Sequence, residues 1–359
     1  MARLQIRLDR LIDNIDRISR LMREHGKEWS LVVKVLGTDR NVLERVLIHP
    51  AIRNTHSIAV SQWKSLKIVK DIDPSLRTMF IKPPAPTNAA QIVRYADISF
   101  NSSLMTIQAL SREAVKQNKL HRVIVMIEMG ELREGINREG LIPFYKRVFR
   151  LPHIIVAGIG TNLGCMYGIQ PTYDKLIQLV LYRQLLEAKF KRKLELVSGA
   201  SSITIPLLEK GKVPREMNHF RIGEAAFLGT TPLNNQQLPD LNTDAFTFEA
   251  NIVELYKKSG QPDGLLSDGA VGSTAELQDD AAELRFRAIL DFGELDADPA
   301  HLLPEDPKLR FLGNSSDLTV YDLGDNPNLY KTGDKIRFRL KYLALAKLMY
   351  SRFVEKVLV

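Results

Sequence analysis

The segment SLVVKVLG, residues 30–37, places one lysine inside a run of aliphatic residues. Such a run is typical of a strand that is buried on both faces in a parallel sheet. We therefore predict a first strand over Ser30 to Val35, with Lys34 at its end. Aliphatic neighbours should partly desolvate the Lys34 ammonium group and lower its pKa, and such an amine can form a Schiff base with a carbonyl. The alternative is a strand residue whose amine simply reaches into water.

Further short runs of β-branched or aliphatic residues follow this segment, and amphipathic stretches separate them. The pattern is that of repeated βα units around a parallel sheet. With the first run there are eight predicted strands, the others being 57–60, 78–81, 97–100, 122–128, 153–158, 194–198, and 219–222 leading into 225–228. The predicted helices between them are 41–48, 62–71, 104–117, 141–149, 173–189 and 203–210. Eight such repeats indicate a (β/α)₈ barrel of the TIM type, whose active site lies at the C-terminal ends of the strands.

The composition of the sequence changes after Gly229. The segment TTPLNNQQLP, residues 230–239, is polar and interrupted by proline. This composition is typical of a linker. We predict a barrel domain over residues 1–235 and a smaller, mostly β C-terminal domain over residues 236–359. The strands of the second domain should begin near Ala245, because Gly, Pro, Asn and Asp separate its apolar runs: 246–255, 284–290, 318–322 and 335–340. A terminal helix over 342–353 is a further expectation.

The composition is that of a folded protein without a membrane span. Hydrophobic residues make up 45% of the chain but form no uninterrupted apolar stretch of about 18 residues. The first 22 residues repeat apolar positions every three or four residues, which predicts a surface helix and, with it, a cytoplasmic location. The single cysteine, Cys165, excludes an internal disulfide framework. The net charge of +8 comes from scattered basic residues, which favours anionic small molecules over nucleic acid as partners.

Two loops late in the predicted barrel have the composition of a phosphate site. SGASS, residues 198–202, is small and rich in hydroxyls, and RIGEA, residues 221–225, contains a glycine that permits close backbone approach. Barrels commonly hold phosphate with the loops after strands seven and eight. Either loop alone could be a helix cap or a turn. Combined with a Schiff-base lysine on the first strand, they describe a pocket for pyridoxal 5'-phosphate (PLP).

A resemblance to a known family is then carried by five further segments together with the serine segment SGASS (198–202). The chain resembles the alanine-racemase-like family of fold-type III PLP enzymes, and most of all its ornithine and lysine racemase branch. The similar segments are VVK (32–34), MGELREGI (129–136), GIGTNLGC (158–165), HFRIGE (219–224) and GNSSD (313–317). The resemblance implies that Lys34 carries the cofactor and that Arg133 lies near its phenolic oxygen. It also implies that Arg221 bonds the pyridine nitrogen and that Asn162 takes the place of a ring-stacking histidine.

The same resemblance assigns the phosphate to Ser198, Ser201, Ser202 and the amides of Gly223 and Glu224. It also implies a homodimer in which the loop 313–317, with Ser316 towards the substrate, reaches into the partner's site. An arginine beside the pyridine nitrogen matters chemically, because a guanidinium does not give up its proton and leaves that nitrogen uncharged. The resulting weak electron withdrawal favours rapid reprotonation of a carbanion. We therefore predict an amino acid racemase, with a basic amino acid such as ornithine or lysine as the suggested substrate.

Racemisation needs a proton donor or acceptor on each face of Cα, and Lys34 can serve only one of them. The family's tyrosine in a Ser-Tyr-Gly segment has no counterpart here, since the corresponding region, Gly260 to Leu266, contains none. The candidates for the second base are Cys165, Ser316 and Asp317. A lone cysteine is more often a small core residue, and Asp317 could cap a turn. A histidine expected after Asp317 is Leu318, and a tyrosine expected near Phe353 is absent.

Other classes of protein fit the sequence less well. The glycines of 158–164 depart from the spacing of a dinucleotide fingerprint, and the histidines do not pair with carboxylates at the spacing of metal ligands. A PLP-dependent lyase or aldolase would usually add a metal site. The main alternative is a PLP-binding regulator or cofactor carrier without turnover. Such carriers are single barrels, so the predicted second domain argues for an enzyme.

Overall fold

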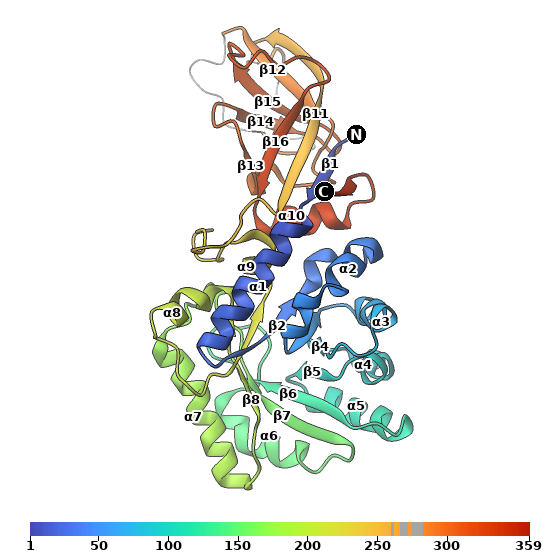
Figure 1. Ribbon diagram of the computed structural model, residues 1–359, viewed down its shortest axis with the longest axis vertical. Helices are drawn as coiled ribbons and strands as arrows, with labels where there is room; N and C mark the ends of the chain where they lie inside the picture. Colours follow the sequence, from blue (N-terminus) through green and yellow to red (C-terminus); the bar gives the residue numbers. More distant parts are fainter. Residues whose placement is uncertain (260–261, 266–271, 275–282) are drawn as a thin grey trace. The chain divides into compact units, whose positions relative to one another are not determined.

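The computed structural model describes residues 1–259, 262–265, 272–274 and 283–359, and it divides the chain into two compact units (Figure 1). One unit comprises Leu11–Asn242, and the other combines Met1–Arg10 with Thr243–Val359. The boundary therefore falls a few residues after the predicted one at 235/236, and the first ten residues join the C-terminal unit. The predicted linker belongs to the first unit, where Leu238 and Leu241 are buried.

The first unit is built on a parallel barrel. Its strands follow the order β8-β7-β6-β5-β4-β3-β2-β10-β9, so neighbours in the ring are mostly neighbours along the chain. Their bounds are β2 (Glu28–Val32), β3 (Ser57–Val60), β4 (Thr78–Phe80), β5 (Ile98–Asn101), β6 (His121–Met126), β7 (Ile154–Gly160), β8 (Leu196–Ser198), β9 (Ala200–Ser201) and β10 (His219–Ile222). The predicted (β/α)₈ barrel is confirmed.

The ring closes through one extended segment that is split by Gly199. Its first half, β8, pairs with β7, and its second half, β9, pairs with β10. Strand β10 in turn pairs with β2, with Arg221 opposite Ser30. The segment that was predicted to form part of a phosphate site therefore also completes the barrel wall.

Helices follow the strands and lie around the outside of the ring, as Figure 1 shows for the successive helices α3 to α6. Most of the predicted helices are confirmed to within two residues. The bounds are α1 (Leu8–Glu24), α2 (Arg40–Leu47), α3 (Trp63–Ile72), α4 (Ala89–Tyr95), α5 (Leu104–Lys116), α6 (Leu141–Val148), α7 (Tyr173–Phe190), α8 (Ile205–Glu209) and α9 (Glu224–Leu228). None of the described helices is both long and apolar enough to cross a membrane.

Two local predictions in the barrel are wrong. The first strand ends at Val32, and Lys34 lies in η1 (Val33–Leu36), one turn of 3₁₀-helix that leaves the strand. The run 225–228 is not strand but belongs to α9, which begins directly after Gly223. Aliphatic runs of this length fit a buried helix as well as a buried strand, so periodicity alone did not separate them.

The barrel interior is apolar through most of its depth. Its central cluster contains Val32, Ala59, Met79, Ile98, Phe100, Ile124, Met126, Ala157 and Leu196. These side chains come from successive strands and fill the ring as a packed core, as expected for a barrel of this size. Buried polar side chains of the strands are hydrogen-bonded to one another, as Ser99 is to His121 and Ser30 is to His219.

The second unit is mostly antiparallel β, as predicted. Its main sheet has the order β13-β16-β11-β12-β15-β14, and aromatic rings of Phe248, Phe292, Tyr321 and Phe338 pack together in its core. The bounds are β11 (Phe246–Lys258), β12 (Arg285–Leu290), β13 (Leu302–Pro304), β14 (Arg310–Asn314), β15 (Thr319–Gly324), β16 (Lys335–Leu340), α10 (Tyr342–Tyr350) and β17 (Glu355–Leu358).

The N-terminus differs from the predicted helix. Residues Arg3–Ile6 form β1, which pairs antiparallel with β11 and parallel with β17, and the helix α1 begins only at Leu8. Leu4 and Ile6 are buried while Arg3 and Gln5 are half-buried, which is the alternation of a strand. The buried carboxylate of Glu249 accepts from Arg3 Nε (2.6 Å) and Arg337 Nε (2.9 Å), and this ion cluster fixes β1 against the sheet.

We expect Gly158→Ala to destabilise the barrel strongly. Gly158 lies in β7 next to a bulge, and a Cβ there would stand 2.2 Å from the backbone oxygen of Leu196. Overpacking of this kind typically costs about 1–3 kcal/mol. Gly140→Ala is the matched control, because nothing lies within 4 Å of the added Cβ. Urea unfolding followed by circular dichroism should give a lower midpoint for Gly158→Ala alone, and equal midpoints would contradict this account.

Candidate active site at the C-terminal end of the barrel

Lys34 lies at the rim where the strands end. It follows β2, the strand that pairs with β10, so it stands on the same side of the ring as Arg221. Although the Lys34 side chain is exposed, its crowded surroundings lower the pKa of its ammonium group, chiefly by desolvation. The charges of Cys165, Arg133, Arg221 and Glu134 also act on it. The predicted lowering of the Lys34 pKa is confirmed, and the neutral amine is correspondingly easier to reach.

Arg221 is a buried cation that ties the end of β10 to the loop after β7. Its Nη1 donates to Asn162 Oδ1 (2.6 Å) and its Nη2 donates to the backbone oxygen of Thr161 (2.6 Å). The guanidinium carbon lies 5.1 Å from the ring centroid of Phe100. Burial lowers the pKa of Arg221 to about 10, so the group stays charged at neutral pH. Its Nε is buried and has no hydrogen-bond partner among the residues that the structure describes.

A second arginine enters from the loop after β6. Arg133 pairs with the adjacent Glu134, and its Nη1 donates to Cys165 Sγ (2.7 Å). Glu134 also accepts from Asn162 Nδ2. Cys165 is exposed, so its interpretation as a core residue is wrong. Four residues from two loops thus form one connected polar cluster beside Arg221.

Two further carboxylates shape these loops without facing a ligand. The buried Glu131 accepts from the backbone amides of Cys165 (3.1 Å), Tyr167 (2.9 Å) and Ile169 (2.8 Å). Glu128 accepts from the amides of Leu132 (3.1 Å) and Arg133 (3.2 Å). Because these carboxylates accept from backbone amides, both stabilise the conformation of the loops that carry Arg133 and Cys165.

The two predicted phosphate loops are brought together as expected from their strands. Strand pairing sets Ser201 beside Arg221, and Ser202 Oγ accepts from the amide of Ala225 (3.2 Å). A Cβ on Gly223 would lie 3.3 Å from the backbone oxygen of Val32, so the backbone approaches β2 closely at this point. Both loops open a helical turn, whose first amides have no acceptor within the helix.

Ser198 does not join these loops as a hydroxyl donor. It is fully buried, and its Oγ is bonded to His219 Nδ1 (2.8 Å) inside the barrel. Its backbone oxygen is a third, longer acceptor for Arg221 Nη2 (3.5 Å). The geometry makes Ser198 a positioning residue, and the prediction that it contacts phosphate gains no support.

A chain of polar groups, buried except for the half-buried His56 and the exposed Arg77, runs beneath this site through the barrel wall. His219 Nε2 is bonded to Ser30 Oγ (2.8 Å), which is bonded to Ser57 Oγ (2.6 Å). Ser57 Oγ is also bonded to His56 Nδ1 (3.2 Å), whose ring accepts at Nε2 from Arg77 (3.0 Å). Burial lowers the pKa of His219 well below its ordinary value, so the ring is neutral.

The remaining predicted residues belong to the other compact unit. Ser316 Oγ donates to Asp317 Oδ2 (2.6 Å), and the amide of Leu318 donates to Ser315 Oγ (3.3 Å). Leu318 and Phe353 are exposed. The barrel itself therefore assembles Lys34, Arg133, Asn162, Cys165 and Arg221, but not Ser316 or Asp317. In the region Gly260 to Leu266, residues 260, 261 and 266 lie outside the described residues.

Sequence reasoning missed Glu134 and Thr161. Glu134 connects Arg133 to Asn162, and Thr161 supplies the oxygen that holds Arg221. Adjacent opposite charges before Gly135 were the available signal for Glu134. No signal pointed to Thr161, because its contribution is a backbone oxygen and any residue type carries one.

Comparison with solved structures shows the same fold. The alanine racemase of Corynebacterium glutamicum matches with a TM-score of 0.73 at 19% identity, covering 100% of this chain and 99% of that one. The alanine racemase of Bartonella henselae, solved with covalently bound pyridoxal phosphate, matches with a TM-score of 0.72 at 15% identity, covering 100% and 99%.

Comparison with curated proteins finds closer sequences. The ornithine racemase of Acetoanaerobium sticklandii is 34% identical over 99% of both chains. The lysine racemase of Thermotoga maritima is 34% identical over 78% of this chain and 77% of its own. Fold, site and relatives together define an isomerase of the racemase class. The model of the alanine racemase N-terminal domain matches residues 6–231, and the chain belongs to that family.

The stability of the protein should depend on the titration of Glu224. Desolvation raises the pKa of this carboxyl to about 7, against 4.5 when it is solvated. Between these pH values the folded chain keeps a proton that the unfolded chain has released, so the free energy of unfolding should fall as pH rises. Glu224→Gln removes this contribution to the pH dependence of the free energy of unfolding. We expect the stability of the wild type relative to Glu224→Gln to drop by roughly 2 kcal/mol from pH 5 to pH 7.5.

Urea titrations at several pH values measure this difference. The exposed Glu139→Gln is the matched control, and its stability relative to the wild type should stay constant over the same range. A constant difference for Glu224→Gln as well would show that the Glu224 carboxyl is already ionised in the folded protein at pH 5.

Proposed function

We propose that the chain interconverts the L and D forms of a basic amino acid, with ornithine and lysine as the first candidates, and that it uses PLP held by Lys34. The observation that carries the proposal is the presence, at one barrel rim, of an amine of lowered pKa and a buried arginine whose Nε has no partner among the described residues. The choice of a basic amino acid rests on the two curated relatives, whose names specify ornithine and lysine.

The residues at the rim fit PLP. Arg221 Nε–H is a buried donor without an acceptor, and the pyridine nitrogen of PLP is an acceptor of the required kind. Lys34 would hold the aldehyde carbon, and Arg133 would face the phenolic oxygen. Asn162 is bonded to Arg221 and would take the place of the ring-stacking histidine. Ser201, Ser202, Gly223 and Glu224 would bind the phosphate with hydroxyls and backbone amides.

The bound cofactor would act as the electron sink that lets a proton leave Cα. Arg221 would limit the strength of that sink, because at a pKa of about 10 it remains a hydrogen-bond donor and does not transfer its proton to the ring. Its bonds to Thr161 and Asn162 hold it in that orientation. Lys34, once released by the substrate, would carry the proton on one face of Cα. The chain's own residues therefore favour rapid reprotonation at Cα.

A second proton carrier is required on the opposite face. Cys165 is the candidate that the barrel supplies, since its thiol is exposed and held by Arg133. Asp317 is the candidate in the C-terminal unit, with Ser316 beside it as a substrate contact. We infer that Asp317 would act in the partner's site of a homodimer, whereas Cys165 would act within its own chain.

PLP binding should depend on Lys34. The purified protein with added PLP should absorb in the visible region, and Lys34→Ala should abolish that band because the Schiff base is proposed to form on Lys34. Lys82→Ala is the matched control, because Lys82 is an exposed lysine two residues after β4 at the same end of the barrel. A wild type that never takes up PLP would rule out the proposed function. Uptake without exchange of the Cα proton for deuterium, with ornithine, lysine and other amino acids alike, would identify a carrier.

The second base can be identified by complementation between inactive variants. Asp317→Asn or Cys165→Ser should lower the racemisation rate by about a hundredfold or more if the residue is the base. Mixing Lys34→Ala with Asp317→Asn subunits should restore activity if Asp317 serves the partner's site, because the mixed dimer contains one intact site. Mixing Lys34→Ala with Cys165→Ser should restore nothing if Cys165 serves its own chain.

The readout is optical rotation, and Ser316→Ala is measured alongside because Ser316 is the remaining candidate for the second base and a proposed substrate contact. Variants that lack the second base should still exchange the Cα proton of one enantiomer through Lys34. Full racemase activity in both Cys165→Ser and Asp317→Asn would show that neither residue is the base.

A further inference from the structure

We propose that the outer faces of α6 and α7 form one surface that binds an anionic phospholipid bilayer from the side of water. The two helices are neighbours on the outside of the barrel (Figure 1). They end at Val148 and Phe190, and the chain then enters β7 and β8. Because these helices run antiparallel to the strands, their last turns lie at the end of the barrel opposite to Lys34. The surface is therefore separate from the candidate active site.

Helix α7 is apolar on the face that it turns to solvent as well as on the face that it packs against the barrel. Its buried positions include Leu176, Leu179, Val180 and Leu186. Between residues 176 and 186 the exposed side chains are Leu181, Gln184 and Leu185, and the two leucines are 53% and 51% exposed. In α3, by contrast, every exposed residue is charged. A helix that is apolar on both faces indicates that a second contact covers its outer face.

Two basic segments lie at the end of this apolar row. KRVFR, residues 146–150, ends α6, and KFKRK, residues 189–193, ends α7. Together they contain seven cationic side chains and no acidic one, and all seven are exposed. None of the seven forms an ion pair within the described part of the chain. The carboxylates that flank KFKRK are already paired, Glu187 with Arg183 and Glu195 with Arg122.

Contacts between the ends of the two helices join the basic segments. The rings of Phe149 and Phe190 pack with their centroids 5.2 Å apart. The Arg192 guanidinium carbon lies 4.9 Å from the centroid of the Phe149 ring, and Arg192 Nη1 donates to the Phe149 backbone oxygen (3.5 Å). Leu185 and Lys189 are four residues apart on α7 and are therefore neighbours on one face. The apolar row thus continues directly into the basic segments.

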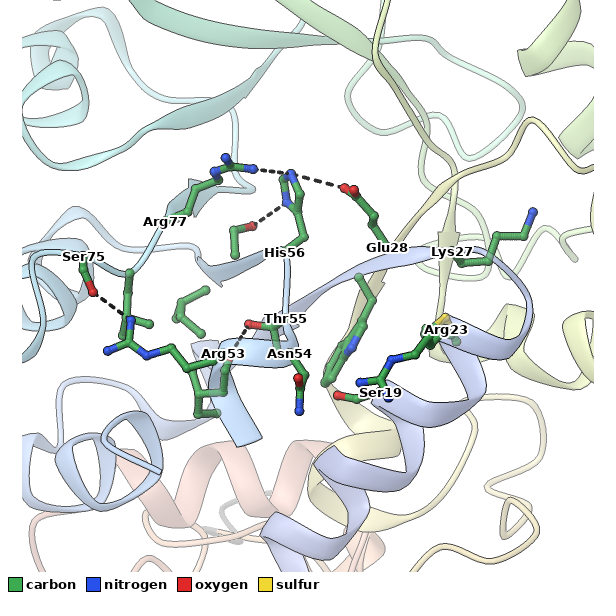
Figure 2. A pocket seen from close by; sticks show the side chains of 16 residues that line it. Ser19, Arg23, Lys27, Glu28, Arg53, Asn54, Thr55, His56, Ser75 and Arg77 are labelled. Atoms are coloured by element: carbon green, nitrogen blue, oxygen red, sulfur yellow. Dashed lines mark hydrogen bonds and ion pairs between the residues drawn. The ribbon is translucent and has the colours of Figure 1, made fainter. Parts of the chain in front are cut away.

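Basic side chains around the cavity in Figure 2, at the same end of the barrel, are mostly bonded within the chain. Arg77 donates to His56 Nε2 (3.0 Å), and Arg53 donates to Ser75 Oγ (2.7 Å). Among the seven cations of the two basic segments, the side chain of Arg192 alone has a hydrogen bond to a described residue. These cations are therefore available to an external anion.

An anionic bilayer accounts for both the charge and the leucines. Lys and Arg side chains are attracted to anionic headgroups, while apolar side chains of the same surface enter the boundary of the acyl chains. A nucleic acid would use the cations but would give no role to Leu181 and Leu185. A second copy packed antiparallel along α7 would bury these leucines. It would, however, set each basic end against a first turn with a single acidic residue, Asp174. We therefore assign the surface to phospholipid.

Sedimentation of the full-length protein with vesicles tests this assignment. The vesicles contain phosphatidylglycerol and phosphatidylcholine in equal amounts, and vesicles of phosphatidylcholine alone are the uncharged control. We expect at least about tenfold tighter binding to the anionic vesicles, because each cation near the surface contributes to the attraction. Added salt should weaken this binding, because it screens exposed charges. Equal binding to both kinds of vesicle, or binding to neither, would overturn the proposal.

Two pairs of substitutions examine the basic and the apolar part separately. Lys189→Gln with Lys193→Gln should weaken binding to the anionic vesicles about tenfold or more, because two attracted charges are lost. Leu181→Gln with Leu185→Gln should also weaken it about tenfold or more, because less apolar surface is buried. Glutamine keeps a helix propensity close to that of leucine, so α7 should stay folded.

Lys64→Gln with Lys82→Gln is the matched control for the loss of two charges. Both are exposed lysines outside α6 and α7 that form no ion pair within the described part of the chain, and their replacement should leave vesicle binding unchanged. Equal weakening by this control would show that only the overall charge of the protein matters, which would contradict a defined surface.

Two further results would assign the surface to another partner and overturn the proposal. One is tight binding of a single-stranded oligonucleotide together with unchanged vesicle binding in Leu181→Gln with Leu185→Gln. The other is a smaller molar mass of that variant than of the wild type in light scattering, which would show that a second copy covers α7. The test does not depend on the proposed function. Lys34→Ala should bind the vesicles as the wild type does, and the variants of α7 should still take up PLP.

Discussion

The guanidinium of Arg221 is the group on which the organisation of the candidate site depends. It is buried, it keeps its charge, and its bonds to Thr161 and Asn162 join the last barrel strand to the loop after β7. A buried cation without partners would be costly, so these acceptors and the face of Phe100 are needed to hold it there. Asn162 is hydrogen-bonded to Glu134, and Glu134 forms an ion pair with Arg133. The positions of both arginines are therefore set together.

The polar chain below the site has a defined direction. A guanidinium has no acceptor, so Arg77 must donate to His56 Nε2, and the proton of the neutral His56 ring is then on Nδ1. Ser57 accepts that proton's hydrogen bond and can donate to Ser30. Ser30 donates to His219 Nε2, which leaves Nδ1–H of His219 to donate to Ser198. Each hydrogen is used once in this arrangement. The arrangement leads from the exposed Arg77 to the buried His219 and Ser198, and two neutral histidines connect neighbouring strands along it.

The fold was largely accessible from the sequence because its signal is repeated. Eight aliphatic runs with amphipathic stretches between them predict the barrel even when one run is misplaced, as 225–228 was. The prediction of single elements was less accurate. Residues 1–22 show helical periodicity throughout, yet Leu4 and Ile6 are buried in a strand, because pairing with β11 and β17 overrides the local pattern. The position of Lys34 was predicted to within a turn, but its backbone leaves the strand before it.

The candidate site was predictable only as far as residue types carry its chemistry. Lys34 is recognisable from its place in an aliphatic run, and Arg133 and Arg221 from the resemblance of their segments to the family; the structure gathers all three. Contacts through backbone atoms, such as the oxygen of Thr161, cannot be predicted from residue type, because every residue carries a backbone oxygen. The second base that the proposed racemisation requires could not be assigned from residue type either. Its two main candidates lie in different compact units, and spacing along the chain carries no information about which of them stands across Cα from Lys34. Burial does not decide it either, because a proton carrier at a substrate site must remain accessible until the substrate binds, as Cys165 and Asp317 both are in the single chain. In the proposed homodimer, the choice between them is therefore a question of which subunit would complete the site.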